Sequence, residues 1–182
     1  MKFVIIGGDA AGMSAASRAK RNAPNMEVVV LEATRDVSYS ACGMPYNIAD
    51  ASREIDDLVV RRAEVFREKQ SIDLRLDHRV VAIDRSKKEV IGRTSAGESF
   101  KEGYDKLLIA TGARPRSLGV PGADLPGIKT LKNLQDGRAI KSYLVDNDVK
   151  AALIVGMGYI GLEMAEAFVL RGVRVHMIEL MP

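Results

Sequence analysis

The feature that most constrains the fold is a glycine-rich motif at the start of the chain. An unbroken apolar run (residues 3–6) leads into GGDAAG (residues 7–12), a stretch of small residues follows, and a second apolar run ends at Glu32, 20 residues after Gly12. Strand, glycine turn, helix, strand and acid in this order are typical of a dinucleotide-binding unit. In such a unit the backbone N–H groups at the helix start face a pyrophosphate, and the acid accepts hydrogen bonds from ribose hydroxyls.

The same motif returns near the end of the chain. Residues 151–155 form another apolar run, GMGYIG follows at residues 156–161, a helical pattern ends before Gly172, and a strand-like run ends at Glu179. The first glycines of the two copies are 149 residues apart, as are the third glycines, and the two acids are 147 residues apart. Two copies in this register indicate an α/β chain rather than two unrelated glycine turns.

The first copy departs from the pattern at its middle glycine, which is replaced by Asp9. A carboxylate at this place would repel a pyrophosphate unless the side chain turns away. Two motifs imply two dinucleotides, and a flavin with a nicotinamide is the natural pair, because hydride transfer needs both rings held face to face. The acid at Glu179 favours NADH over NADPH as the nicotinamide.

The segment between the two motifs has a different period. From Ile72 to residue 83 apolar residues alternate with polar ones, and two polar turns, DRSKK and SAGE, follow before the apolar run at residues 107–109. This pattern predicts a small antiparallel meander inserted before a last parallel strand. The stretch at residues 115–127 contains glycine and proline and is expected to be a linker, and Asn133, with Asp136 three residues later, is expected to cap the next helix.

Together these patterns predict a Rossmann-like three-layer α/β fold with an antiparallel meander, followed by the start of a second Rossmann-like domain. We expect residues 1–112 to be the N-terminal part of an FAD-binding domain, and residues 113–182 to be a linker and the incomplete start of an NAD(P)H-binding domain. A domain of this kind needs more strands than the second copy supplies. We therefore expect the chain to be a truncated portion of a longer enzyme, and to be inactive by itself.

The single cysteine lies in the segment SYSACGMPY, residues 38–46. Pro45 is suited to the first turn of a helix, so Cys42 is expected just before a helix N-terminus, where the helix dipole favours the thiolate form. Gly43 would let the backbone approach a ring, and a flavin bound over the first glycine turn would lie against the sulfur. The alternative is an inert, buried cysteine.

Composition excludes several classes of function. The net charge of +3 is small and the basic residues form no block, so we expect no nucleic-acid partner. One cysteine cannot make an internal disulfide and fits a reducing, cytoplasmic compartment. The longest apolar stretch, residues 151–170, contains Glu163, Glu166 and three glycines, so we expect no membrane span. We expect no metal site either.

Five segments, IIGGDAAGMSAAS, VVVLE, SYSACGMPY, YDKLLIATGARPR and VGMGYIGLEMAE, resemble the single-cysteine branch of the pyridine nucleotide-disulfide oxidoreductases. This branch contains coenzyme A-disulfide reductases, NAD(P)H-dependent persulfide or polysulfide reductases, NADH oxidases and NADH peroxidases, and Asp9 is itself a form met in it. The resemblance implies FAD contacts from Gly7, Asp9, Ala11, Gly12, Glu32, Ala33, Val81, Ala110, Thr111 and Gly112. It implies nicotinamide contacts from Gly156, Gly158, Tyr159, Ile160, Gly161 and Glu179.

The resemblance also implies a catalytic group. Cys42 would be the redox sulfur, and Tyr159 would be a lid on the flavin that nicotinamide displaces. Glu163 would lie nearby, the alternative being a solvated helix residue. For coenzyme A, possible as a further ligand, the resemblance suggests contacts from Arg18, Arg21, Ser38 and Lys69, and ordinary solvated charges are the alternative.

Within the branch, one position favours the reductases. Peroxidases and oxidases of this group carry a histidine inside the first glycine turn, where this chain has Ala10, and His78 and His176 lie in strand patterns elsewhere. We therefore expect a flavoprotein in which NAD(P)H reduces FAD, and Cys42 carries electrons to a small disulfide, persulfide or polysulfide, with coenzyme A disulfide favoured. The full-length enzyme is expected to be a homodimer.

Three alternatives stay open. An NADH oxidase or peroxidase would cycle Cys42 through a sulfenic acid. A non-catalytic nucleotide-binding module would use Cys42 as a redox-sensing switch. A flavin-dependent reductase that feeds an iron–sulfur protein would share the fold, but such reductases lack a cysteine at this place.

Overall fold

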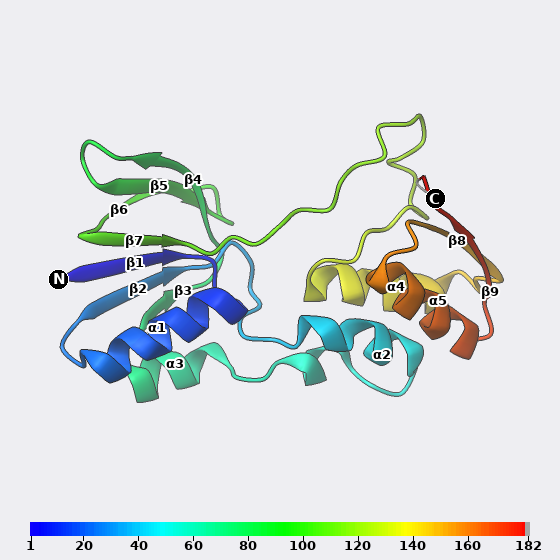
Figure 1. Ribbon diagram of the computed structural model, residues 1–182, viewed down its shortest axis with the longest axis horizontal. Helices are drawn as coiled ribbons and strands as arrows, with labels where there is room; N and C mark the ends of the chain where they lie inside the picture. Colours follow the sequence, from blue (N-terminus) through cyan, green and yellow to red (C-terminus); the bar gives the residue numbers. More distant parts are fainter. Residues whose placement is uncertain (181–182) are drawn as a thin grey trace. The chain divides into compact units, whose positions relative to one another are not determined.

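The computed structural model describes residues 1–180, which fold into two compact units (Figure 1). The first unit consists of residues 1–39 and 59–113, and the second of residues 40–58 and the chain from residue 114 onward. The segment that contains Cys42 therefore belongs with the later part of the chain, although it lies within residues 1–112 of the sequence. The assignment of the two parts to FAD and to nicotinamide stays a prediction.

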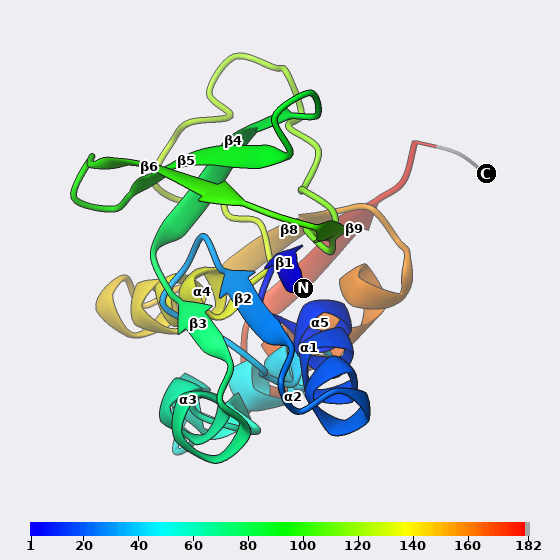
Figure 2. The same ribbon diagram turned by 90° about the vertical axis from the view of Figure 1, so that its left-hand side faces the viewer.

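A four-stranded parallel sheet forms the centre of the first unit (Figures 1 and 2). In spatial order its strands are β3 (Asp73–Arg75), β2 (Glu27–Leu31), β1 (Lys2–Ile6) and β7 (Lys106–Ile109). β1 and β2 are the central strands, and most of their residues are buried. Their unbroken apolar sequences are those of strands covered on both faces.

Different elements cover the two faces of this sheet, which gives three layers. Helices α1 (Ala10–Asn22) and α3 (Ala63–Gln70) cover one face, where Phe66 belongs to the buried cluster. An antiparallel meander of β4 (His78–Asp84), β5 (Glu89–Thr94) and β6 (Ser99–Gly103) covers the other face, where Val90 packs on the sheet. The predicted three-layer fold with an antiparallel meander is confirmed.

One part of the predicted meander is wrong. The alternation that begins at Ile72 predicts a hairpin strand, but β3 pairs in parallel with β2 at the edge of the central sheet. Ile72 and Leu74 are each 2% exposed because they pack in the same cluster as Phe66 of α3. The alternation then continues into β4 through Asp77, whose positive φ of 57° separates the two strands.

A buried carboxylate joins the meander to the central sheet. Glu102 of β6 is 8% exposed and forms ion pairs with Lys2 of β1 and, at 2.6 Å, with Arg75 of β3. Hydrogen bonds from Lys2 to Glu102 and to Glu27 raise the pKa of Lys2 above its ordinary value of 10.5. Two cations around one buried carboxylate compensate for its loss of hydration.

The second unit contains a two-stranded parallel sheet, β8 (Ala151–Val155) and β9 (Arg174–Ile178), joined by helix α5 (Tyr159–Leu170). Its other elements are the 3₁₀ turns η1 (Ala41–Gly43) and η2 (Ile55–Leu58) and the helices α2 (Met44–Ala49) and α4 (Leu134–Asp146). The predicted cap of α4 is confirmed, because Asp136 N donates to Asn133 Oδ1 at 2.9 Å and Asn133 N donates to Asp136 Oδ2 at 3.2 Å. Within residues 1–180, no helix is both long enough and apolar enough to cross a membrane.

Replacing Glu102 by glutamine should lower the free energy of unfolding by about 1.5–3 kcal/mol, because charged hydrogen bonds to Lys2 and Arg75 are lost in a buried place. The matched control is Glu98→Gln, an exposed carboxylate next to the same strand, which should change stability by less than about 0.5 kcal/mol. Urea unfolding measures both variants. Equal stability of the two variants at neutral pH would contradict this role of Glu102.

The same interaction has a pH dependence with a definite sign. The folded-state pKa of Lys2 is raised, so its contribution to stability is complete below its ordinary value of 10.5 and is lost as pH rises through the folded-state pKa. The stability advantage of the wild-type chain over Glu102→Gln should therefore persist at neutral pH and shrink in strongly alkaline solution.

Candidate functional site

The first glycine turn, residues 7–12, joins β1 to α1 and depends on two glycines. Gly7 has a φ of +108°, and a Cβ there would overlap the carbonyl oxygen of Ala110. A Cβ on Gly12 would overlap the carbonyl oxygen of Gly7, because the first turn of α1 lies against that carbonyl. The turn thus contains four of the residues proposed for FAD, Gly7, Asp9, Ala11 and Gly12, and brings Gly7 against a fifth, Ala110.

The second glycine turn, residues 156–161, repeats this geometry. Gly156 has a φ of +104°, and a Cβ on Gly161 would overlap the carbonyl oxygen of Gly156. The middle position is different, because Gly158 has a φ of −68° and a Cβ there would meet no atom within 4 Å. The fold itself does not need glycine at that position.

Asp9 occupies the equivalent middle position of the first turn. Its φ of −100° is ordinary for a residue with a side chain. Its Oδ1 accepts a hydrogen bond from Tyr39 N at 3.4 Å. The carboxylate thus has a backbone donor of its own, which lowers the repulsion that a pyrophosphate would meet.

The acids that close the two motifs make the same contact. Glu32 Oε2 accepts a hydrogen bond from Gly8 N at 2.6 Å, and Glu179 Oε2 accepts one from Met157 N at 2.7 Å. Gly8 and Met157 are the second residues of the two turns. The sequence predicts that these acids bind ribose hydroxyls, and the structure adds that they fix the glycine turns. Thr34 N and Thr34 Oγ1 also donate to Glu32 Oε1, each at 2.8 Å, and Leu180 N donates to Glu179 Oε1 at 2.7 Å, so a ribose hydroxyl would share these acceptors with donors of the chain.

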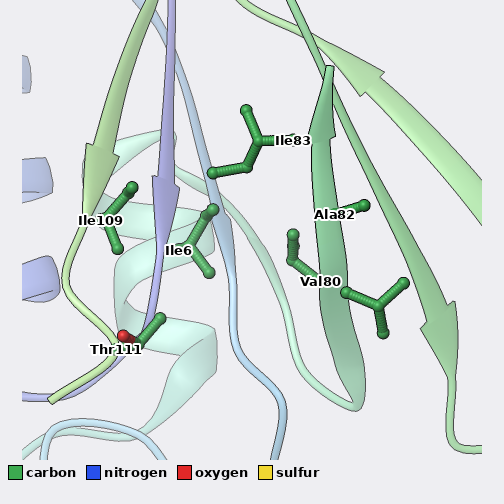
Figure 3. Close-up of a pocket in the computed structure, with 7 residues that line it drawn as sticks. Ile6, Val80, Ala82, Ile83, Ile109 and Thr111 are labelled. Carbon is green, nitrogen blue, oxygen red and sulfur yellow. The ribbon is translucent and has the colours of Figure 1, made fainter. Parts of the chain in front are cut away.

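An apolar cavity of about 300 Å³ lies at the carboxyl ends of β1 and β7. Ile6 and Ile109 come from these two strands, and Ile83 points toward them from β4 (Figure 3). Ligands of open parallel sheets bind outside the carboxyl ends of the strands, so this cavity is a candidate for an apolar part of a cofactor. Two residues suggested for FAD, Val81 and Thr111, help to line it.

The sequence did not predict the other residues of this cavity, which are Ile6, Val80, Ala82, Ile83 and Ile109. A signal was present, because VVAI at residues 80–83 is apolar on both faces of a strand. The remaining suggested FAD residues lie at the ends of neighbouring elements: Ala11 in the first turn of α1, Ala33 after β2, and Gly112, with a φ of +66°, after β7.

Cys42 lies in η1, directly before α2, where the sequence places it. Its side chain is exposed, whereas Met44 and Pro45 are buried, so the alternative of a buried cysteine does not hold. Gly43, which follows Cys42, lies against η2, a contact that the sequence does not predict. A Cβ on Gly43 would lie 2.7 Å from Leu58 Cδ2, so a larger residue there would require the end of the Leu58 side chain in η2 to shift.

A second cavity, of about 150 Å³, lies entirely within the second unit beside this turn. Its lining residues are Cys42, Lys132 and Glu163, together with the apolar residues Ala41, Met44, Pro45, Leu131 and Ile160. Tyr159 is 88% exposed and does not line this cavity. Lys132 was not predicted from the sequence, because no local motif marks it. Its backbone N donates to Asp136 Oδ2 at 2.8 Å, so the cap of α4 fixes its position.

The short helix α2 is held at its carboxyl end by Lys141 of α4. Lys141 Nζ lies 2.6–2.9 Å from four oxygens, among which its three N–H groups are shared: the carbonyl oxygens of Asn47, Asp50 and Arg53 and the side-chain oxygen of Asn47. Burial, and then the charge of Arg171, lower the pKa of Lys141. A helix of six residues leaves most of its last carbonyls without intrahelical partners, so this one ammonium fixes the element that follows Cys42.

The four residues suggested for coenzyme A all lie in the first unit. Arg18 and Arg21 are exposed on α1, and Lys69 is exposed near the end of α3. Ser38 is half-buried, has a φ of +50°, and donates from its backbone N to the carbonyl oxygen of Gly8 at 3.2 Å. Within residues 1–180 no hydrogen bond or ion pair joins these four side chains, so a coenzyme A site stays a prediction.

Comparison with known proteins identifies the family. The family model described as pyridine nucleotide-disulphide oxidoreductase matches residues 1–182. The chain belongs to this family. A CoA-dependent NAD(P)H sulfur oxidoreductase from Pyrococcus abyssi is 46% identical over 175 residues, which are 96% of this chain and 38% of that protein. An NADH oxidase from Methanocaldococcus jannaschii is 35% identical over 182 residues, which are 100% of this chain and 41% of that protein.

Solved structures of the same oxidoreductase family agree with the fold. The NAD-dependent persulfide reductase from A. fulgidus is 35% identical with a TM-score of 0.93, and the match covers 100% of this chain and 34% of that one. The chain thus spans about two fifths of the length of the curated relatives, and it matches their N-terminal portion.

The two glycines of the second turn should respond differently to alanine. Gly161→Ala should lower the free energy of unfolding by about 2 kcal/mol or more, because the new Cβ overlaps the carbonyl oxygen of Gly156. Gly158→Ala should lower it by less than about 1 kcal/mol, because the position is open and its φ is ordinary, and the only loss is that alanine caps a helix less well than glycine. Urea unfolding followed by circular dichroism compares them. A Gly158→Ala variant as unstable as Gly161→Ala would refute this difference.

Removing the Lys141 ammonium should increase the local opening of residues 40–58, the segment that contains Cys42. In Lys141→Met the amides of residues 40–58 should exchange with solvent deuterium about tenfold faster, because several charged hydrogen bonds to α2 are lost. Lys150→Met is the matched control, since Lys150 is exposed and pairs only with the nearby Asp148 among the described residues. Hydrogen exchange read by mass spectrometry measures both. Unchanged exchange over residues 40–58 would show that Lys141 does not hold α2.

Proposed function

We propose that the whole protein is a flavoprotein oxidoreductase that uses NAD(P)H and FAD to reduce a small disulfide, persulfide or polysulfide through Cys42, with coenzyme A disulfide favoured. The observation that carries this proposal is the exposed Cys42 thiol, which lines a cavity with two charged side chains. The relatives named for sulfur and persulfide reduction support a sulfur substrate. We expect the protein to act as a homodimer in the cytoplasm, where an exposed thiol stays reduced.

The first glycine turn fits the pyrophosphate of FAD. Gly7 and Gly12 carry no Cβ where the turn is tightest, as a cradle for a pyrophosphate requires. We assign the ribose to Glu32 and an apolar part of the cofactor to the cavity that Val81 and Thr111 help to line. The remaining proposed contacts are Asp9, Ala11, Ala33, Ala110 and Gly112. When bound, FAD would supply two-electron transfer from NAD(P)H to a sulfur.

The second glycine turn fits the nicotinamide dinucleotide in the same way. The proposed contacts in and after the turn are Gly156, Gly158, Tyr159, Ile160 and Gly161. The open space at Gly158 would let a pyrophosphate approach the backbone. Glu179 would accept hydrogen bonds from ribose hydroxyls, which favours NADH over NADPH. Tyr159, exposed at the start of α5, is proposed as the lid that nicotinamide displaces.

Cys42 is proposed to perform the sulfur chemistry. Its thiolate attacks one sulfur of a substrate R–S–S–R′, so that a Cys42–S–R bond forms, the S–S bond of the substrate breaks, and R′–S⁻ leaves with the electron pair. The mixed disulfide on Cys42 then takes up two electrons and a proton, supplied by NAD(P)H, and separates into the Cys42 thiolate and R–SH. Glu163 lines the same cavity and is proposed as a further member of the catalytic group.

A coenzyme A substrate would need cations for its phosphates. Arg18 and Arg21 lie one helical turn apart on α1, so both belong to one face of that helix. With Lys69 of α3 and Ser38 near the first glycine turn, they are the proposed contacts for coenzyme A. The CoA-dependent NAD(P)H sulfur oxidoreductase from Pyrococcus abyssi, to which this chain is similar, supports this choice.

An NADH oxidase is the second candidate, and the relative from Methanocaldococcus jannaschii favours it. In that reaction Cys42 would pass through a sulfenic acid on the way to reducing oxygen or peroxide. Ala10 argues against it, because a histidine at that place in the first glycine turn is expected of the oxidases and peroxidases.

Kinetics of the whole protein with four acceptors test the proposal: coenzyme A disulfide, polysulfide, hydrogen peroxide and oxygen. NADH should bleach the flavin absorbance, and turnover should be fastest with coenzyme A disulfide. Cys42→Ser should lower that turnover roughly a thousandfold or more while NADH still reduces the flavin. The matched control is Ser40→Ala in the same segment, which should keep turnover near the wild-type rate.

The other results separate the alternatives. Fastest turnover with oxygen or peroxide, together with a trapped sulfenic acid on Cys42, would favour the oxidase. Undiminished turnover of Cys42→Ser with every acceptor would exclude Cys42 from the reaction. A whole protein that binds no flavin would leave only a nucleotide-binding or redox-sensing module.

A further inference from the structure

The end of helix α2 and the loop after it place a cluster of oxygens around one ammonium group. Lys141 Nζ lies 2.8 Å from the carbonyl oxygens of Asn47 and Asp50, 2.6 Å from that of Arg53, and 2.9 Å from Asn47 Oδ1. A lysine ammonium has three N–H groups, one fewer than the oxygens around it. The oxygens therefore surround the nitrogen as they would surround a bound cation, and their number does not match the donors of a lysine side chain.

The charges near this nitrogen compensate for part of its loss of hydration. Burial, and then the charge of Arg171, lower the pKa of Lys141, and the negative charges of Glu54, Asp50 and Asp57 oppose this. Carbonyl oxygens at the carboxyl end of a helix also carry partial negative charge, which stabilises a nearby cation. The place that Lys141 Nζ occupies thus has both the oxygens and the neighbouring carboxylates of a site for one positive charge.

Helix α2 needs a contact of this kind because it has only six residues. A helix this short is not stable by itself in water, so tertiary contacts must hold it. Two other cations contact the same part of the chain more weakly. Arg171 donates to the carbonyl oxygen of Ile48 at the long distance of 3.4 Å, and Arg138 pairs with Asp56, whose side chain is exposed. Exposed ion pairs contribute little to stability, so Lys141 supplies the strongest of these polar contacts.

We propose that Lys141 is a positioning residue for Cys42, and that its ammonium is the tethered occupant of a monovalent-cation site at the end of α2. The turn η1, which contains Cys42, runs directly into α2, and Asn47 follows Cys42 by five residues. Five residues of helix span about 7–8 Å, so a displacement at Asn47 reaches the cysteine within two turns. Small misplacements of a reacting group lower the rate of a reaction strongly. The role of the sulfur in this inference rests on the proposed function, whereas the cation site does not.

Removing the side chain and supplying a free cation tests the site. In the whole protein, Lys141→Ala should make the amides of residues 40–58 exchange with solvent deuterium about tenfold faster than in the wild-type chain in the same salt. Ammonium chloride should reverse most of this change, because an ammonium ion has one N–H group for each of the four oxygens. Tetramethylammonium chloride of equal ionic strength has no N–H group and should not reverse it. The matched control Lys150→Ala, which removes an exposed lysine, should show neither effect.

Turnover is the second readout. With coenzyme A disulfide, Lys141→Ala should lower kcat about tenfold and leave the KM for NADH unchanged, because the sulfur is misplaced while the nicotinamide site is intact. Ammonium chloride should restore kcat, and tetramethylammonium chloride should not. A residue with a merely structural role would not give a kcat that follows the identity of the added cation.

The possible results either support or overturn the proposal. Wild-type exchange over residues 40–58 in a folded Lys141→Ala variant overturns it, and so does faster exchange that ammonium leaves unchanged. Restored exchange with an unaffected kcat overturns the positioning of Cys42. If Lys141→Ala does not fold, circular dichroism decides: helical signal regained in ammonium alone supports the cation site, and an unfolded chain in both salts overturns it. The exchange measurement needs neither flavin nor turnover, so a wild-type protein that reduces no disulfide refutes the proposed function and leaves the test of the cation site valid.

Discussion

In both glycine turns, the first turn of the helix lies in direct contact with the carbonyl group of the first glycine. In each copy the third glycine, Gly12 or Gly161, lies so close to the carbonyl oxygen of the first that no Cβ fits between them. The first glycine takes a positive φ, +108° at Gly7 and +104° at Gly156, which reverses the chain within a few residues. These contacts determine where α1 and α5 start relative to their strands, and hence where the free N–H groups of each helix lie.

The middle position of each turn obeys a different constraint. Gly158 has an ordinary φ and open space around it, and Asp9 stands at the same place in the first turn without strain. The fold therefore requires the first and third glycines, whereas a glycine in the middle concerns how closely a ligand can approach. An aspartate at position 9 is therefore compatible with the fold. The Asp9 carboxylate accepts a hydrogen bond from Tyr39 N.

Local patterns predicted most of the fold, and long-range contacts account for what they missed. The two glycine units, the cap at Asn133 and the turn before α2 follow from neighbouring residues, and the structure has all of them. The partner of β3 was missed because the alternation at Ile72 is the same for a hairpin and for an edge strand of a parallel sheet. Lys141 was missed because its contacts lie far away in the chain, and Lys132 because Cys42 and Glu163, which line the same cavity, are distant from it in sequence. The oxygens that bind Lys141 are 88–94 residues from it in sequence.

The segment that carries the cysteine explains why the candidate sulfur site could not be located from sequence order alone. Tyr39 pairs with Val59, so residues 40–58 leave the first unit and return to it at one place. Between these points the segment packs with the second unit, where Lys141 holds the end of α2 and Leu58 packs against Gly43. Cys42, Lys132 and Glu163 therefore line a cavity built from one unit only. The positions of Lys132 and Glu163 in this lining are therefore determined within that unit, Lys132 by the cap of α4 and Glu163 by the first turns of α5.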